Sequence, residues 1–362
     1  MWGDLKPVYR FPILFLGMVS LIIGILAGIG RLGTLVPQVA LQQVAHHGVL
    51  MIPAFFGTVI GLERAVAIGQ RWAYLAPLLT GLGGLLLLAS MSSSALLLLV
   101  AGSLLFLGAS VRVLQIQSAV HNWILLGGAV ALLSGNILLF NGAEIDEVIY
   151  WWIAFLVLTI AGERLELSRL VVQSGRRRLL LALLSVVPLA GAALRPFSPE
   201  DGLLLFSAGL AGIGLWLLLF DIARRTVRLN GLTRFTAVCM LAGYAWLLAS
   251  AVLFVTVQLG IGAVTRDAPL HSLLLGFVFS MVIGHALIIF PAVTQLRIPY
   301  SPLFYLPLLL LQLSLLVRVG GGIAGSSSLL LHGGHLNGVA LALFILTLVW
   351  SIARGQLNRS GR

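Results

Sequence analysis

Charged side chains are the scarcest feature of this chain. Asp, Glu, Lys and Arg make up 9% of its 362 residues, whereas hydrophobic residues make up 60%. A soluble domain carries about 25% charged residues, so a chain this poor in charge cannot form a water-facing surface. Soluble classes of protein are therefore excluded. Because an open chain in lipid satisfies its backbone as helices, the long apolar runs predict an all-α polytopic membrane protein.

Cysteine and acidic residues are scarce as well. The single cysteine, Cys239, excludes disulfide bonds within the chain. The absence of a Cys-x-x-Cys-His motif excludes covalent attachment of a c-type haem, so any bound haem would be held non-covalently. Lys and Arg outnumber Asp and Glu by 22 to 11. In a membrane protein this excess belongs to cytoplasmic loops and does not indicate a nucleic-acid partner.

Long polar insertions are missing too, so residues 1–362 are predicted to form a single transmembrane domain. Spanning a bilayer takes about 20 apolar residues, and the sequence contains twelve such runs. We expect them at residues 11–33, 38–67, 72–90, 94–114, 119–141, 147–168, 179–195, 202–222, 233–258, 268–293, 302–323 and 334–353.

Arginines mark every second connection between these runs. The opposite connections carry most of the acids, such as Glu144 and Asp267. The positive-inside rule then predicts cytoplasmic termini, in the cytoplasmic (inner) membrane of a bacterium or archaeon, with the lipid bilayer as a partner. The arginines concerned are Arg71, Arg112, Arg176, Arg177, Arg178, Arg224, Arg225, Arg228, Arg234 and Arg297.

Two runs carry ionisable residues at membrane depth, where such residues are costly and usually mark function. The second run begins with His46 and His47, and the tenth begins with His271. Both runs enter from the outside, so we expect these three histidines at a similar depth near the outer surface. His285 lies 14 residues beyond His271. In a regular helix that is about 21 Å deeper and within about 40° of the same face.

A short motif recurs near the inner ends of three runs. It reads Gly61-Leu62-Glu63-Arg64 in the second, Gly162-Glu163-Arg164 in the sixth and Ile283-Gly284-His285 in the tenth. A spacing of four runs is what three repeats of a four-helix unit would give. The pattern therefore favours three four-helix arcs with pseudo-threefold symmetry. Such short motifs also recur by chance, and an arrangement without repeats stays open.

Twelve spans, cytoplasmic termini and histidines on the second and tenth spans resemble the haem-copper oxidase subunit I superfamily. In that fold three four-helix arcs surround the cofactors, and the same two spans supply both axial ligands of a low-spin haem. The resemblance implies a non-covalent haem b held by His271 and by His47 or His46. It also implies a redox partner or a small gas as the protein's counterpart.

The sequence departs from the oxidase pattern at the oxygen-reducing centre. Oxidases carry His-x-His on the tenth span, whereas His271 is followed by Ser272 and Leu273. The sixth and seventh spans contain no histidines for copper. In this respect the chain is similar to the NnrS family, twelve-span haem proteins linked to nitric-oxide stress. It lacks that family's His-x-His-Glu-Met signature.

Adjacent histidines point about 100° apart on a helix, so only one of His46 and His47 can face a haem. We favour His47, because Gly48 beside it lets a flat macrocycle approach. The alternative is an interfacial pair among lipid headgroups. Haem propionates would also need a cation at the outer side. Arg266 is the candidate, and its alternative role is that of an interfacial arginine.

A second metal, such as copper, is a further expectation. If their spans pack together, His285 with Glu63 and Glu163 would form a metal site or a proton relay. Alternatively His285 makes an interhelical hydrogen bond that fixes packing. Glu163 would then simply offset the burial of its neighbour Arg164.

His332 and His335 are the last pair of candidate metal ligands. Their spacing places both on one face of a helix. Two ligands alone do not make a site, and the two glycines between them favour a loop instead.

Three functions are compatible with these observations. The first is a b-type haem protein on an oxidase-like scaffold, for electron transfer or for sensing or handling nitric oxide or oxygen. Intramembrane His and Glu are also common in proton-coupled secondary transporters. A cofactor-free assembly factor for a respiratory enzyme would share the fold. Whether the protein is itself an enzyme stays open.

Overall fold

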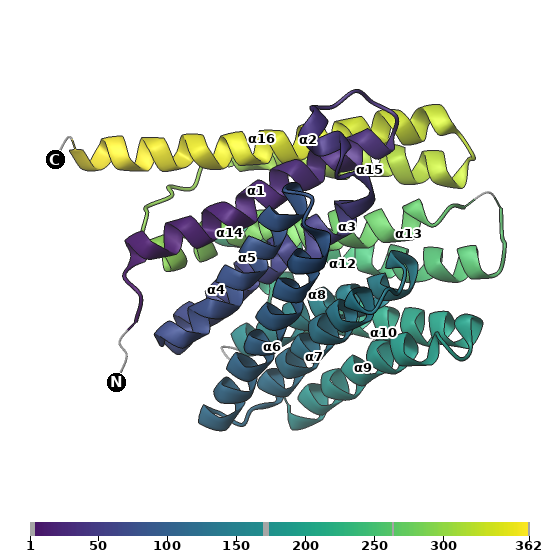
Figure 1. The fold of residues 1–362 in the computed structure, drawn as a ribbon, viewed down its shortest axis with the longest axis horizontal. Coiled ribbons are helices and arrows are strands. Elements are labelled where there is room, and N and C mark those ends of the chain that lie inside the picture. Colours follow the sequence, from purple (N-terminus) through teal and green to yellow (C-terminus); the bar gives the residue numbers. More distant parts are fainter. Residues whose placement is uncertain (1–3, 169–173, 263, 361–362) are drawn as a thin grey trace. The chain divides into compact units, whose positions relative to one another are not determined.

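The contacts within the chain form two compact units, Met1–Gly162 and Glu163–Arg362, where the sequence predicts one domain (Figure 1). The computed structural model describes residues 4–168, 174–262 and 264–360. The division falls near the C-terminal end of the sixth span, so each unit contains about half of the apolar runs. Every contact discussed below lies within one unit.

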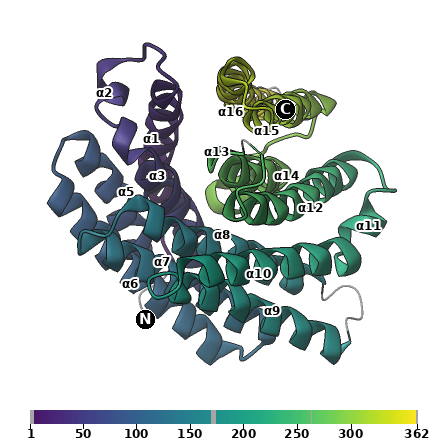
Figure 2. The ribbon, with the colours of Figure 1, turned by 90° about the vertical axis from the view of Figure 1, so that its right-hand side faces the viewer.

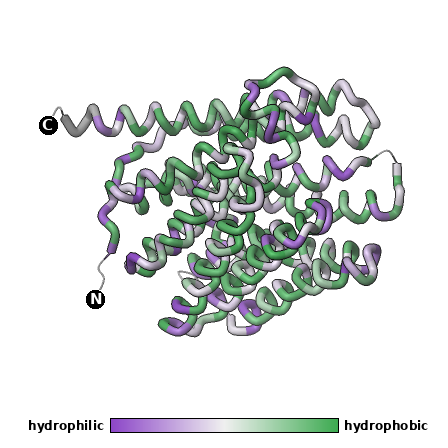
Figure 3. The backbone as a smooth tube through the Cα atoms, in the orientation of Figure 1, coloured by the Kyte–Doolittle hydropathy of each residue, from purple (hydrophilic) through white to green (hydrophobic). Residues whose placement is uncertain are grey.

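Twelve helices in the described part of the chain are long and apolar enough to cross a membrane. Apolar residues dominate their length, and polar residues gather near their ends (Figure 3). The protein is therefore an all-α, multi-pass membrane protein. In chain order the spans are α1 (Pro7–Arg31), Val44–Ile68, η3 (Arg71–Tyr74) with α5 (Leu75–Leu88), α6 (Ser92–Ile116), α7 (Val120–Phe140), α8 (Ile145–Leu167), α9 (Gly175–Leu194), α10 (Pro199–Phe220), α12 (Gly231–Gln258), Asp267–Thr294, η6 (Pro302–Phe304) with α15 (Tyr305–Ile323), and α16 (Ser327–Ser360).

Simple local signals set the ends of these helices, which is why the predicted boundaries agree closely with the structure. Pro7 and Pro199 occupy first helical positions, where the missing amide hydrogen costs nothing. Gly69 ends the second span in the left-handed conformation, with φ of 67°, which a glycine adopts without strain.

The largest boundary differences occur at the start of the second span and at both ends of the last helix, which continues to Ser360 where the sequence predicts an end at 353. Residues near 38 form a separate short helix, α2 (Gln38–Leu41), before the second span begins at Val44. The last span begins at Ser327 and not near residue 334, so His332 and His335 lie within α16. The interpretation of this glycine-containing stretch as a loop was wrong, because the apolar residues on both sides continue the helix through the glycines.

The second and tenth spans share a local irregularity. In the second, α3 (His47–Val49) leads into the π-helical segment η2 (Leu50–Phe56) and then α4 (Gly57–Ile68). In the tenth, α13 (Asp267–His271) leads into the π-helical segment η5 (Ser272–Phe279) and then α14 (Ser280–Thr294). Pro53 lies within η2, and a proline removes one backbone donor. Such segments are rare and occur frequently at functional sites.

The π-helical segment of the tenth span also corrects one sequence estimate. The relation between His271 and His285 assumed a regular α-helix, but eight residues between them are π-helical. A wider turn rotates the chain less per residue. The estimate of about 40° therefore does not apply across this segment.

Burial along the chain repeats every four spans. In the second, sixth and tenth spans, 67%, 72% and 67% of the most apolar window is buried, against 28–50% in the other nine spans of the described chain. These are the three spans that share the Gly-containing motif. Burial therefore follows the period of four that the sequence favours.

Helical hairpins form the outer parts of both units. The pairs α5 with α6, α9 with α10 and α15 with α16 lie side by side (Figures 1 and 2). Glycines permit close approach in the α9–α10 hairpin, because a Cβ at Gly191 would overlap the backbone nitrogen of Phe206. In α12 and α14, Gly284 packs on the fully buried Cys239 in the same way. Small residues at such contacts are typical of membrane helix packing.

The glycine contact in the α9–α10 hairpin gives a stability test. We expect Gly191→Ala to lower the free energy of unfolding by about 1–3 kcal/mol, because the added methyl group forces the two backbones apart. Thermal unfolding of the detergent-purified protein measures the effect. Gly108 on α6 is the matched control, since a Cβ there meets nothing within 4 Å. Equal unfolding temperatures for G191A and G108A would show that the hairpin does not depend on this contact.

Candidate functional site

His47 is anchored through one ring nitrogen in the first unit. Its Nδ1 lies 2.7 Å from the carbonyl oxygen of Gly24 on α1. A carbonyl oxygen only accepts hydrogen bonds, so in the neutral ring Nδ1 carries the hydrogen and Nε2 the lone pair. The ring packs against Gly28, where a Cβ would lie 2.7 Å from Cε1 of the imidazole. This is the tautomer in which a histidine binds a metal through Nε2 while its other nitrogen is held by an acceptor.

His46 is held by a different chain of hydrogen bonds. Gln43, which is almost fully buried, donates from Nε2 to the carbonyl oxygen of Leu87 at 3.1 Å. Its Oε1 lies 3.1 Å from Nδ1 of His46. Because that oxygen accepts, Nδ1 of His46 donates, and Nε2 again carries the lone pair. The two adjacent histidines thus have separate supports, as expected for neighbouring positions about 100° apart.

His271 ends α13 in the second unit and is oriented by an acid one turn earlier. Its Nδ1 lies 3.0 Å from Oδ1 and 3.1 Å from the backbone oxygen of Asp267. Both atoms accept, so the neutral ring carries its hydrogen on Nδ1 and leaves Nε2 as the basic nitrogen. A carboxylate in this position fixes the ring and raises the basicity of the other nitrogen.

Asp267 also forms a bidentate ion pair with Arg318 of α15. Nε of Arg318 donates to Oδ2 at 2.8 Å, and Nη2 donates to Oδ1 at 2.7 Å. The paired donors match the two carboxylate oxygens and fix the carboxylate plane. His271 is therefore tied to a second helix through Asp267. Arg266, the residue predicted to face haem propionates, is the N-cap of α13.

The proposed axial pair is divided between the two units. His47 belongs to residues 1–162 and His271 to residues 163–362. Each ring, within its own unit, has its Nδ1 held by an acceptor. The binding of both rings to one iron remains a prediction.

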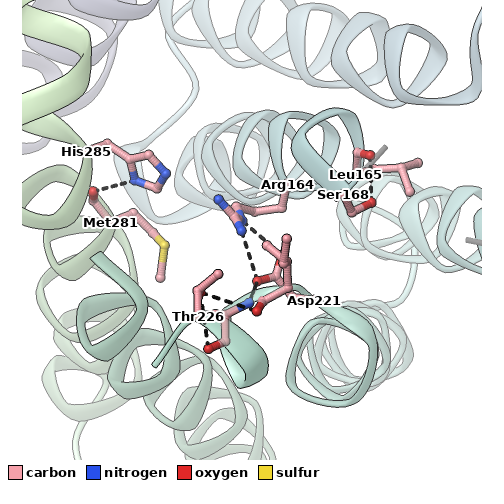
Figure 4. A network of polar contacts seen from close by, with 9 residues as sticks. Arg164, Leu165, Ser168, Asp221, Thr226, Met281 and His285 are labelled. Atoms are coloured by element: carbon pink, nitrogen blue, oxygen red, sulfur yellow. Dashed lines mark hydrogen bonds and ion pairs between the residues drawn. The ribbon is translucent and has the colours of Figure 1, made fainter. Parts of the chain in front are cut away.

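A buried ion pair occupies the second unit at the ends of α8 and α10 (Figure 4). Arg164 donates from Nε to Oδ2 and from Nη2 to Oδ1 of Asp221, each at 2.9 Å. The two residues are 4% and 3% exposed. Oδ1 also accepts from the backbone nitrogen of Ala223 at 2.7 Å, which holds the carboxylate in the turn after α10. Such a pair is costly in lipid unless its geometry is good, and here all of these hydrogen bonds are short.

Two further polar side chains lie beside this ion pair. Tyr244 on α12 interacts electrostatically with both Arg164 and Asp221. Its hydroxyl is fully buried and makes no hydrogen bond of good geometry to the described residues. His285 on α14 has its ring turned toward the Arg164 guanidinium, and its Nδ1 lies 2.8 Å from the backbone oxygen of Met281 (Figure 4). Four polar groups from four segments thus converge in an apolar surrounding.

The remaining metal candidates do not all belong to one unit. Glu63 lies on α4 in the first unit, whereas Glu163 and His285 lie in the second. His332 is exposed on α16 and its Nδ1 lies 2.7 Å from the backbone oxygen of Ser328. Among the described residues, no three His, Cys, Asp or Glu side chains come together as a metal site would require. The geometry therefore lends no support to a second metal at these positions.

Sequence reasoning missed three residues of these clusters. Asp267 was detectable, because an acid four residues before a histidine on a helix lies on the same face. Asp221 gave a weaker signal, as the one acid in an arginine-rich connection. Nothing in the sequence singles out Tyr244. Arg164 was assigned to its neighbour Glu163, but its observed carboxylate partner is Asp221, more than 50 residues away in the chain.

Comparison with known proteins gives a family but no activity. Residues 10–353 match the family model described as "Domain of unknown function (DUF8744)". No curated protein matches the chain.

The Arg164–Asp221 pair provides a test of the polar cluster. Asp221→Asn leaves a buried guanidinium without a counter-charge, and we expect it to lower the free energy of unfolding by about 3–5 kcal/mol. The double variant Arg164→Met/Asp221→Leu removes both charges and should regain most of that loss. Chemical unfolding of the purified protein in detergent measures both.

Glu200, an exposed acid in the first turn of α10, is the matched control. Its replacement by glutamine should change the unfolding free energy by about 0.5 kcal/mol or less. If D221N were as stable as E200Q, the buried pair would contribute nothing to the fold.

Proposed function

The chain belongs to the DUF8744 family, whose description names no activity, so we propose its function from geometry: it is an integral-membrane b-type haem protein. His47 and His271 are the axial ligands, and the protein transfers electrons or senses or handles nitric oxide or oxygen. Both termini lie in the cytoplasm, which the distribution of arginines favours. The haem-facing ends of the second and tenth spans then lie toward the outer surface.

One observation carries this proposal. In each of two spans far apart in the sequence, a histidine with an anchored Nδ1 lies one to three residues before a π-helical segment. The two spans are also among the three most buried. A histidine required only for packing has no reason to repeat this combination, whereas two axial ligands need the same tautomer and a rigid ring.

The residues present suit a haem. Neutral imidazole offers one lone pair at Nε2, and the hydrogen bonds of Nδ1 to Gly24 and Asp267 hold each ring in that form. A haem bound between two histidines supplies a one-electron centre. In this chain Asp267 orients the ring of His271, and Gly24 orients the ring of His47. Arg266, which precedes α13, would face a propionate.

An absorption spectrum tests the proposal. The purified protein should show a b-type haem in its reduced-minus-oxidised spectrum, and His47→Ala and His271→Ala should each abolish it. Asp267→Ala should weaken haem affinity by about 10–100-fold, because it removes the carboxylate that orients His271.

His332→Ala serves as the control, since this exposed histidine on α16 should leave the spectrum intact. Gel-filtration profiles of all variants separate loss of haem from loss of fold. A haem spectrum that persists in both H47A and H271A would overturn the assignment. So would a native protein that shows no haem spectrum even after haem has been added to it.

The cluster around Arg164 supports a second candidate, a proton-coupled transporter. A buried tyrosine hydroxyl without a hydrogen bond beside a histidine and an ion pair is a costly arrangement in a membrane. Such groups can exchange protons when a substrate or a conformational change brings them together. This candidate requires no haem.

Proton flux distinguishes the two candidates. A transporter should be colourless and should acidify or alkalinise proteoliposomes in the presence of its substrate. Tyr244→Phe and His285→Gln should each reduce that flux at least tenfold, while H47A and H271A leave it unchanged. The opposite pattern, with a haem spectrum lost in H47A and no flux, supports the haem protein.

A further inference from the structure

A cavity of about 550 Å³ lies in the first unit, at the end of the second span where His46 stands. Apolar side chains from five spans and one loop form its wall, including Val49, Leu87, Leu96 and Leu139. Polar groups at its edge are His46, Ser92, Glu144 and Asp146. Ligand pockets commonly measure about 300–1,000 Å³ and combine apolar walls with a few placed polar groups.

His46 is prepared to accept a hydrogen bond in this cavity. Its Nδ1–H is committed to Gln43, which is in turn committed to Leu87. The remaining nitrogen, Nε2, carries the lone pair and makes no hydrogen bond to the described residues. A neutral imidazole in this state receives an N–H or O–H donor from a ligand.

The loop between α7 and α8 adds negative charge to the same cavity. Gly142, with φ of 89°, turns the chain so that Glu144 and Asp146 follow at the rim. The carboxylate of Glu144 makes no hydrogen bond or ion pair with the described residues and is exposed. No arginine or lysine lines the cavity. The rim therefore attracts cations.

The apolar wall and the negative rim together decide the kind of cation. No three His, Cys, Asp or Glu side chains of the described chain form a group that could hold a metal ion, whereas apolar side chains form most of the wall. A cation with an apolar body suits such a cavity. Its body would cover the apolar wall, and its ammonium group would donate to Nε2 of His46 or to the exposed carboxylate of Glu144.

We propose that this cavity binds an organic ammonium group carried on an apolar body. Either a soluble amine or the headgroup of an aminophospholipid has this chemistry. The site is separate from His47 and His271 and does not depend on a haem.

Binding of benzylamine to the full-length protein in nanodiscs tests the proposal, with benzyl alcohol as the neutral analogue. Isothermal titration should show saturable binding of benzylamine at least tenfold tighter than binding of benzyl alcohol, because only the amine carries a charge. Benzylamine binding should weaken as salt rises, since exposed charges are screened. Equal affinities for the two compounds, or no saturable binding at millimolar concentration, would contradict the proposal.

Variants at the rim locate the site. Glu144→Gln should weaken benzylamine binding about two- to fivefold, the range expected for an exposed charge pair. Glu147→Gln is the matched control, because Glu147 lies on the same turn but does not line the cavity. His46→Phe should weaken binding further by removing the inner acceptor. If E144Q and E147Q bind benzylamine equally, the charge attraction lies elsewhere and the proposal fails.

Lipid composition identifies the source of the ammonium group. Nanodiscs of phosphatidylglycerol alone are compared with nanodiscs that also contain phosphatidylethanolamine. A higher apparent Kd of benzylamine in the second set shows that the lipid headgroup competes for the cavity. An unchanged Kd shows that the cavity takes a soluble amine. H271A should bind benzylamine normally, so failure here and failure of the haem assignment are distinguishable.

Discussion

Inside a bilayer every polar group must find its partner within the protein, because lipid offers none. This constraint explains most of the side-chain geometry of the chain. His47 turns one nitrogen to a backbone carbonyl, His271 turns one to Asp267, and Arg164 meets the carboxylate of Asp221 with both donors. In each case the fold supplies the partner that lipid cannot offer, and the direction of the side chain is fixed as a result.

The span count and most boundaries could be predicted because hydropathy alone decides them. An apolar run of membrane length has no alternative to a helix, and proline or glycine marks many of its ends. The irregular segments could not be predicted. Neither η2 nor η5 has a sequence signature beyond Pro53, and the interpretation of the glycines near His332 as a loop failed because flanking apolar residues continued the helix.

The candidate site was predictable in part, for a different reason. Histidines and acids within apolar runs are visible in any sequence, so His46, His47, His271 and His285 could be chosen. Their partners depend on which helices pack together. Arg164 and Asp221 are brought together by the packing of α8 against the end of α10, and no local pattern encodes that contact. For this reason the sequence suggests the adjacent Glu163 as the partner of Arg164, although the observed partner is Asp221.

The single cysteine has a practical consequence. Cys239 is fully enclosed between α12 and α14, with Gly284 against its Cβ. Water-soluble maleimides should not reach this thiol while the fold is intact. The native chain should therefore give no signal in thiol labelling with such reagents. A cysteine introduced into a loop would then be the one labelled thiol, and its labelling would show which side of the membrane that loop faces.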